Sequence, residues 1–63
     1  TSLAAHMKAH RMERAASLLL KTQDDIGAIG RAVGYESQSR FTSAFRECYG
    51  VSPGEYRRAH PPA

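Results

Sequence analysis

The 63-residue sequence has a single cysteine, no long apolar run and no stretch that alternates between apolar and polar residues over a strand length. One cysteine, Cys48, cannot form an internal disulfide, so nothing ties the fold to an oxidising compartment and we expect a cytoplasmic protein. No run approaches the roughly 18 apolar residues that span a bilayer, and we expect no signal peptide and no membrane partner. The missing alternation leaves an all-α fold class.

The short chain also argues against catalysis. At this length folding buries only about 60% of the unfolded surface, and a cleft of normal depth does not fit. No Ser, His and Asp arrangement comes with a strand-turn-helix elbow, so we expect no enzyme and no cofactor. His6, His10 and Glu13 follow one another at one-turn spacing, which suits zinc, but no fourth ligand is visible and we expect no metal site. The formal charge of +3 permits an anionic partner without requiring one.

Glycines and capping residues divide the chain into helices. No Gly or Pro occurs from Leu3 to about Lys21, and apolar residues recur there at helical spacing, which predicts one long helix with Ser2 as its N-cap. Apolar residues at positions 26, 29 and 33 predict a short second helix, which one of the two preceding aspartates caps. Gly34 follows, and we expect it to end that helix in the left-handed conformation.

Two further helices are predicted after this glycine. Ser37 is placed to cap a helix that runs to Tyr49 and ends at Gly50. Ser52 to Glu55 reads as a capping box with proline at the first helical position, and Pro61-Pro62 closes the chain. Leu3, Met7 and Ala15 fall close to helical spacing on the long helix. We expect Tyr35 to be an apolar plug in the turn and Cys48 to be a small buried residue. The residues expected in the core are Leu18, Leu19, Ile26, Ile29, Val33, Phe41 and Phe45.

A short helix, a turn of about three residues and a second helix form the layout of a helix-turn-helix, whose second helix lies in the DNA major groove. Burial of Phe41 and Phe45 would leave polar residues exposed at the start and middle of that helix. Glutamine can pair with adenine, arginine with guanine, and serine with either. The alternative is a solvated polar face on a helical protein-interaction or ligand-sensing module without DNA contact. Spacing alone leaves both interpretations open.

A larger pattern runs from about residue 2 to residue 58. Its parts are Arg11-Met12-x-x-Ala15, Ile26-x-x-Ile29-Gly30-x-x-Val33-Gly34-Tyr35, Ser37-x-Ser39-x-Phe41, Phe45-Arg46, Gly50-Val51-Ser52-Pro53 and Tyr56-Arg57. In this order and spacing, these residues resemble the AraC/XylS family of bacterial transcription regulators.

The resemblance implies a domain organisation. Family members carry two helix-turn-helix units joined by a long central helix, so residues 1–22 would be the linker helix, at whose start a first unit ends. Residues 23–63 would be the second unit with its C-terminal helix, homeodomain-like in architecture. Residues 1–10 are also self-similar to residues 51–60 at an offset of 50, with Ser, Ala and His coinciding. The resemblance explains this as the ends of two duplicated units.

The resemblance further implies sequence-specific DNA binding for transcription regulation, with the Ser37–Tyr49 helix in the major groove. The partners would be double-stranded promoter or operator DNA, RNA polymerase for the full-length protein, and an effector bound by a domain absent from this chain. The location would be the nucleoid in the bacterial cytoplasm. Base contacts are predicted at Gln38, Ser39, Arg40 and Ser43, and phosphate contacts at Ser37, Thr42, Arg46, Tyr56 and Arg57. For Arg57 and Arg58 the alternative is an exposed arginine with no DNA role.

Three positions depart from the family pattern. Gly30 stands where the family usually has alanine, a small residue that lets two helices cross closely. Leu3 and His6 replace the proline and tyrosine usual at the end of the first unit. These departures concern the start of the chain more than residues 26–58.

Overall fold

The computed structural model describes residues 3–60 and contains four helices, with no strand in that range. They are α1 (Leu3–Lys21), α2 (Ile26–Ala32), α3 (Gln38–Tyr49) and α4 (Pro53–Ala59). The predicted all-α class is confirmed. The cap expected at Ser2 and the closing prolines at 61 and 62 lie outside the described residues.

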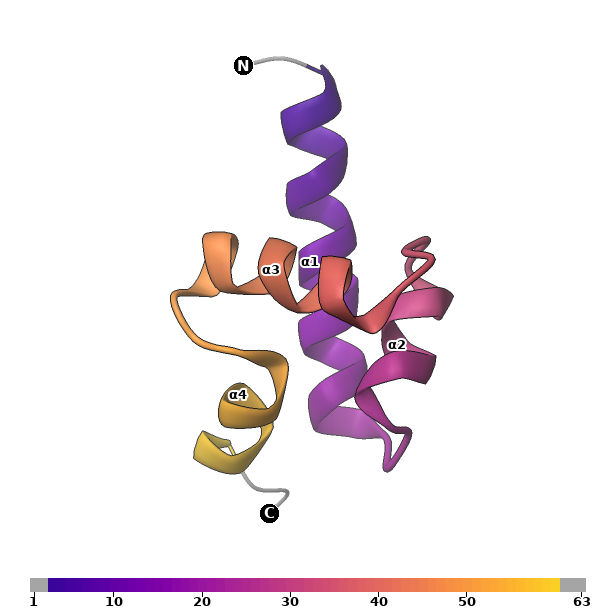
Figure 1. The fold of residues 1–63 in the computed structure, drawn as a ribbon. Helices are drawn as coiled ribbons and strands as arrows, with labels where there is room; N and C mark the ends of the chain where they lie inside the picture. The colour runs from indigo at the N-terminus through magenta and orange to yellow at the C-terminus, as the bar shows by residue number, and fades with distance from the viewer. Residues whose placement is uncertain (1–2, 61–63) are drawn as a thin grey trace.

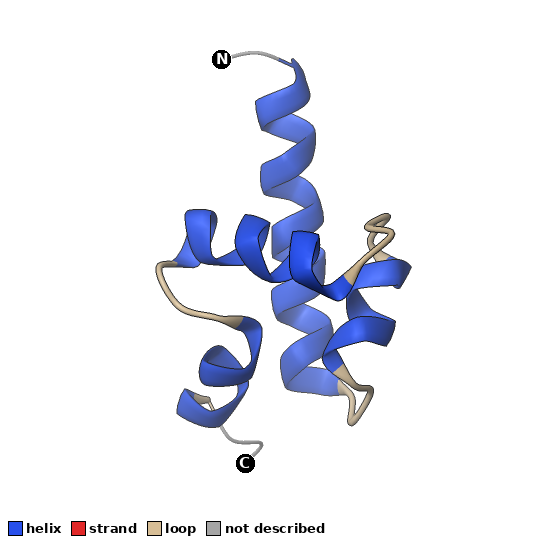
Figure 2. Cartoon of the chain, in the orientation of Figure 1, coloured by secondary structure: helices blue, strands red, loops and turns tan. Residues whose placement is uncertain are grey.

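The helices are arranged around α1. Figure 1 shows α3 crossing α1 near its middle, with α2 and α4 on either side of the C-terminal half of α1. The first turns of α1 extend past the other three helices, which gives the molecule an elongated outline of 36 × 21 × 16 Å. Short loops make the three connections (Figure 2).

One face of α1 supplies four residues of the core. Met12, Ala15, Ala16 and Leu19 are buried at i, i+3, i+4 and i+7, which is the spacing of one helical stripe. They pack against Ile29 and Val33 around α2 and against Phe41, Ala44 and Phe45 of α3. Neither phenylalanine of α3 exposes any surface, as predicted. Leu18, Ile26 and Tyr35 pack at the edge of this cluster.

One expectation about burial is wrong. Cys48 is exposed because it lies in the last turn of α3, where the other helices do not cover its side. Leu3 and Met7, which fall close to helical spacing in the sequence, are 75% and 48% exposed. By helix periodicity, about 100° per residue, both lie on a different side of α1 from Met12 and Leu19, so the buried stripe does not include them.

The predicted caps of α2 and α3 are confirmed. The amide N–H of Ala28 donates to Oδ1 of Asp25 at 2.7 Å, so the second of the two aspartates caps α2. The amide of Arg40 donates to the hydroxyl oxygen of Ser37 at 3.1 Å and starts α3. These side chains accept from amides that have no partner within their own helices.

Left-handed glycines end the two central helices. Gly34 has φ 101° and Gly50 has φ 78°. After α2 the amide of Gly34 donates to the carbonyl of Arg31 at 3.1 Å, and the amide of Tyr35 donates to the carbonyl of Gly30 at 2.9 Å. This pair of bonds is a Schellman motif. It turns the chain sharply and places the Tyr35 ring 5.9 Å from the Phe41 ring, where it acts as the predicted plug.

Candidate nucleic-acid interface

The outward face of α3 is polar and narrow. Since residues advance by about 100° along a helix, the face opposite the two buried phenylalanines carries Ser39, Ser43 and Arg46 at i, i+4 and i+7. All three are exposed. The two serines have short side chains, so another molecule can approach the backbone of α3 closely along this stripe, and Arg46 extends from its far end.

Longer polar side chains flank this stripe in the first turn of α3. Gln38 and Arg40 are both exposed, and the helix periodicity places them on opposite sides of Ser39. Gln38 reaches toward α2, and its Oε1 lies close to the first turn of that helix. The four residues predicted to contact bases therefore lie together on the exposed N-terminal half of α3. Their types offer both donors and acceptors to base edges.

An open hollow of about 800 Å³ lies beside α3 on the Arg40 side. It is lined by Lys8 of α1, by residues of the turn, and by Arg40, Ser39 and Ser43 of α3. Carboxylates from Glu36 and Glu47 also line it, so its charge is mixed.

Lys8 and Glu47 form an ion pair across this hollow, between α1 and α3. Hydrogen bonding to Lys8 lowers the pKa of the Glu47 carboxyl, and the same bond raises the pKa of the Lys8 ammonium. The two residues are 39 positions apart in the chain. Sequence reasoning missed the pair because no local pattern connects positions on different helices.

The predicted phosphate contacts fall into two groups. Ser37, Thr42 and Arg46 lie on or beside α3. The oxygen of Ser37 is engaged as the helix cap, but its hydroxyl hydrogen can still be donated. Thr42 is half-buried and Arg46 is exposed. Hydrogen bonding to Ser52 is the largest cause of the lowered pKa of the Glu55 carboxyl, and the charge of Arg46 lowers that pKa further.

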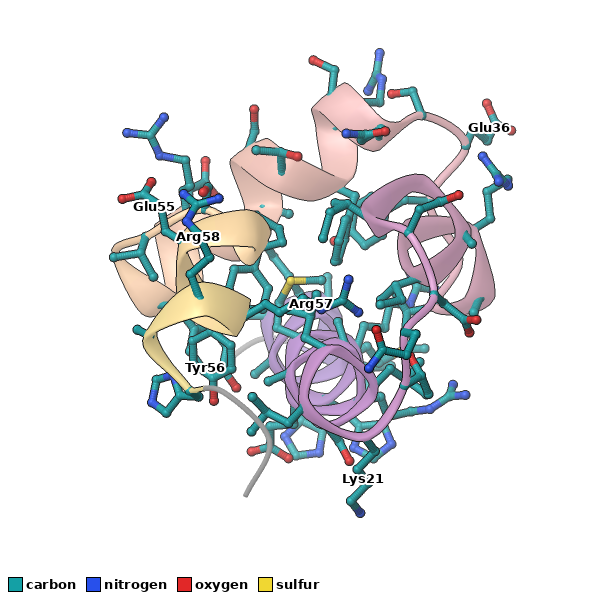
Figure 3. The ribbon with its side chains drawn as sticks, turned by 90° about the horizontal axis from the view of Figure 1, so that it is seen from below. Lys21, Glu36, Glu55, Tyr56, Arg57 and Arg58 are labelled. Atoms are coloured by element: carbon teal, nitrogen blue, oxygen red, sulfur yellow. The ribbon has the colours of Figure 1, made fainter. Side chains whose placement is uncertain are left out.

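Arg57 and Tyr56 lie on α4, and their side chains are engaged inside the protein. The guanidinium of Arg57 donates from Nε to the carbonyl of Leu19 at 3.0 Å and from Nη2 to the carbonyl of Thr22 at 3.3 Å. Figure 3 shows Arg57 pointing from α4 to α1, whereas Arg58 points away from it. Arg57 therefore satisfies carbonyls at the C-terminal end of α1, where a cation is favourable. The guanidinium is thus engaged inside the protein, and the phosphate contact predicted for Arg57 stays a prediction.

The ring of Tyr56 belongs to an aromatic cluster. Its centroid lies 5.4 Å from that of Phe45 and 5.3 Å from that of Tyr49, both edge to face. Phe45 and Tyr49 are themselves stacked at 4.5 Å. The cluster joins α4 to the inner edge of α3, so it fixes the end of the exposed helix in place.

Two further features are absent from residues 3–60, the part of the chain that the structure describes. No group of three or more His, Cys, Asp or Glu residues there is placed to hold a metal ion. None of the helices described is both long and apolar enough to cross a membrane.

A short helix, a turn built on a left-handed glycine and a second, capped helix with an outward polar face define a helix-turn-helix unit. A family model described as a helix-turn-helix domain matches residues 1–59. The chain belongs to this family, the AraC/XylS class of bacterial transcription regulators, whose function is DNA binding in transcription regulation.

The relatives are regulators. The chain is 42% identical over 48 residues to the transcriptional regulator MtrA of Neisseria gonorrhoeae and 40% identical over 47 residues to the arabinose operon regulatory protein of Escherichia coli. These matches cover 76% and 75% of the chain and 16% of each relative. The C-terminal domain of AraT, a response regulator from Geobacillus stearothermophilus, superposes with a TM-score of 0.96 at 41% identity. That alignment covers 100% of the chain and 52% of the AraT domain.

Proposed function

We propose that this chain reads DNA by inserting α3 into the major groove of a promoter or operator, as the second of two helix-turn-helix units. Gln38, Ser39, Arg40 and Ser43 contact base edges. Ser37, Thr42 and Arg46 contact flanking phosphates and set the position of the helix without reading sequence. Tyr56 remains in the proposed phosphate set through its hydroxyl, and Arg57 is assigned to holding α4 on α1.

The observation that carries this proposal is the polar stripe on α3. The short side chains of Ser39 and Ser43 lie between the longer ones of Gln38 and Arg40, and all four are exposed. A flat solvated surface needs no such order of short and long side chains. A groove does, because the helix backbone must come close to the bases while the longer side chains reach to either side.

The same proposal extends to the larger protein. Residues 1–22 form the linker helix, at whose start a first unit ends, and residues 23–63 form the second unit. The exposed apolar turns of α1 at Leu3 and Met7 support this assignment, because a neighbouring unit would cover them. Regulation of transcription adds three further parts to the proposal. RNA polymerase is a partner, an effector binds elsewhere in the protein, and the protein lies at the nucleoid in the bacterial cytoplasm.

Mobility shifts with two variants test the proposed reading. Gln38→Ala is expected to weaken the binding free energy by about 1–3 kcal/mol through one base pair of the preferred site, and to leave binding to random DNA unchanged. Arg46→Ala is expected to weaken binding to both DNAs and to reduce the slope of affinity against salt by about one unit. Both side chains are exposed, so neither change should unfold the protein.

The alternative function makes a different prediction. In an NMR titration with short duplex DNA, a helical interaction module without DNA contact would show no chemical-shift changes along residues 37–46, or changes confined to α1. Changes centred on residues 37–46 would support the proposal.

The mobility shifts also have an outcome that contradicts the proposal. Equal losses of affinity for preferred and random DNA in Gln38→Ala would remove the role of Gln38 in base reading.

A further inference from the structure

Gly27 is a buried glycine at the second position of α2, opposite the start of α3. A Cβ atom added there would lie 3.1 Å from Oε1 of Gln38, 3.4 Å from Nη1 of Arg31 and 3.5 Å from Oδ1 of Asp25. The Gln38 amide therefore lies back across the bare backbone of α2, and the end of the Arg31 side chain comes to the same place from the next turn.

These neighbours differ from those of the other buried glycine in α2. A Cβ at Gly30 would meet the Cβ and Cγ of Phe41, which are core atoms. At Gly27 all three nearest atoms are the ends of polar side chains. Core packing therefore does not require glycine at position 27, and alanine there would favour the helix. What the missing side chain provides is room for the Gln38 amide.

We propose that Gly27 is a specificity-determining position that acts through Gln38, by leaving the space in which the amide rests before and during contact with a base edge. The inference rests on the proposed base-reading role of Gln38. A bidentate contact needs the amide oxygen and nitrogen both within hydrogen-bond distance of the base. A Cβ at 3.1 Å from Oε1 is tighter than ordinary contact, so the amide must shift by a few tenths of an ångström. We expect this shift to lengthen one of the two bonds to the base.

Gly54 offers a matched control. It is also the second residue of a seven-residue helix, α4, and a Cβ there would meet only Nη1 of Arg58 at 3.6 Å, an ordinary contact. Gly54→Ala makes the same chemical change in the same helical position, without a proposed base-reading side chain nearby.

The test compares base preference across five forms of the 63-residue chain: wild type, Gly27→Ala, Gln38→Ala, the double variant, and Gly54→Ala. Each is equilibrated with a randomised duplex library at low salt, and relative affinities for the four bases are determined at every position. Gln38→Ala should remove a preference of about 5- to 150-fold at one base pair, the range of one bidentate contact. Gly27→Ala should lose part of that same preference and no other. The double variant should match Gln38→Ala, and Gly54→Ala should match wild type.

Two measurements on the free chain exclude a merely structural effect. Thermal unfolding should show Gly27→Ala at least as stable as wild type, since alanine favours the helix. The side-chain amide resonances of Gln38 should shift in Gly27→Ala and stay in place in Gly54→Ala.

Several outcomes would overturn the inference. An effect of Gly27→Ala that persists in the Gln38→Ala background shows that the position acts by another route. Equal losses at several base pairs, or an unchanged preference, also contradict it. If wild type shows no base preference at all, the proposed function fails with it. If the preference exists and depends on Gln38 but ignores Gly27→Ala, only the role of Gly27 fails.

Discussion

Gly30 of α2 lies against Phe41 of α3 so closely that a Cβ on the glycine would be 2.9 Å from both Cβ and Cγ of the phenylalanine. The phenylalanine has no exposed surface and cannot move aside freely. The family usually has alanine at this position, and sequence reasoning expected a small residue there because two helices cross. In this chain α2 and α3 approach each other so closely that only glycine fits at position 30.

Gly30→Ala should therefore destabilise the protein, although alanine is the better helix former. Overpacking a core costs about 1–3 kcal/mol, and the gain in helix propensity returns up to about 1 kcal/mol. We expect a net loss on the order of 1 kcal/mol in urea unfolding. Gly54→Ala, where the new methyl group meets only a flexible arginine end at 3.6 Å, should be neutral or stabilising. If wild type and Gly30→Ala were equally stable, α2 and α3 would move apart to admit the methyl group without a loss of folding free energy.

Arg57→Ala should destabilise the protein by about 1–3 kcal/mol, because two carbonyls at the end of α1 lose a charged donor. The adjacent Arg58→Ala should have little effect on unfolding, since Arg58 is exposed. The salt dependence of DNA binding discriminates between an Arg57 that caps α1 inside the protein and an Arg57 that contacts a phosphate. Measured at a temperature where the variant is folded, the salt slope of Arg57→Ala should equal that of wild type. A slope smaller by about one unit would restore Arg57 to the phosphate contacts.

Lys8→Gln should raise the pKa of the Glu47 carboxyl toward its ordinary value, because hydrogen bonding to Lys8 is the largest cause of its lowered pKa. The pair's contribution to stability is present above the unfolded carboxyl pKa and is lost as pH falls through the lowered folded pKa. Both side chains are solvent-exposed to a large extent, 38% for Lys8 and 66% for Glu47, so salt should weaken the pair. Carboxyl resonances of Glu47, followed by NMR across pH, measure the shift. An unchanged titration in Lys8→Gln would show that the pair does not form in solution.

Ser52→Ala should cost about 0.5–2 kcal/mol of stability, the range for losing an N-cap. The hydroxyl oxygen of Ser52 accepts from the amide of Glu55 at 3.2 Å, and the amide of Ser52 donates back to the Glu55 carboxylate at 3.4 Å. The variant should also raise the pKa of Glu55, which hydrogen bonding to Ser52 lowers. The stabilisation from Glu55 therefore fades in wild type as pH falls through its lowered pKa. Ser43→Ala, an exposed serine within α3, is the control for unfolding.

Local signals predicted the helices and their ends well. The caps at Ser37 and Ser52, a cap from one of the two aspartates before α2, the left-handed Gly34 and the helix end at Gly50 were all correct. Each depends on the chemistry of one residue and the backbone within three or four positions of it, which a sequence displays directly. The exposed polar start of α3 was predictable for the same reason, since burial of Phe41 and Phe45 fixes the rotation of the helix.

Sequence reasoning erred where burial depends on what other helices cover. Cys48 has the spacing of an inward residue, yet the end of α3 is uncovered on its side. Arg57 and Arg58 are neighbours of identical chemistry, and the rotation of α4 on α1 alone separates an internal cap from an exposed charge.

The sequence by itself determined the four helices, their caps and the set of polar residues on α3, because these depend on periodicity and on interactions within a turn or two. The tertiary structure decided which side chains from different helices meet: Lys8 with Glu47, Gly30 with Phe41, Arg57 with Leu19 and Gln38 with Gly27. Such contacts depend on crossing angles and distances set jointly by the whole core. No segment of the chain carries that information alone.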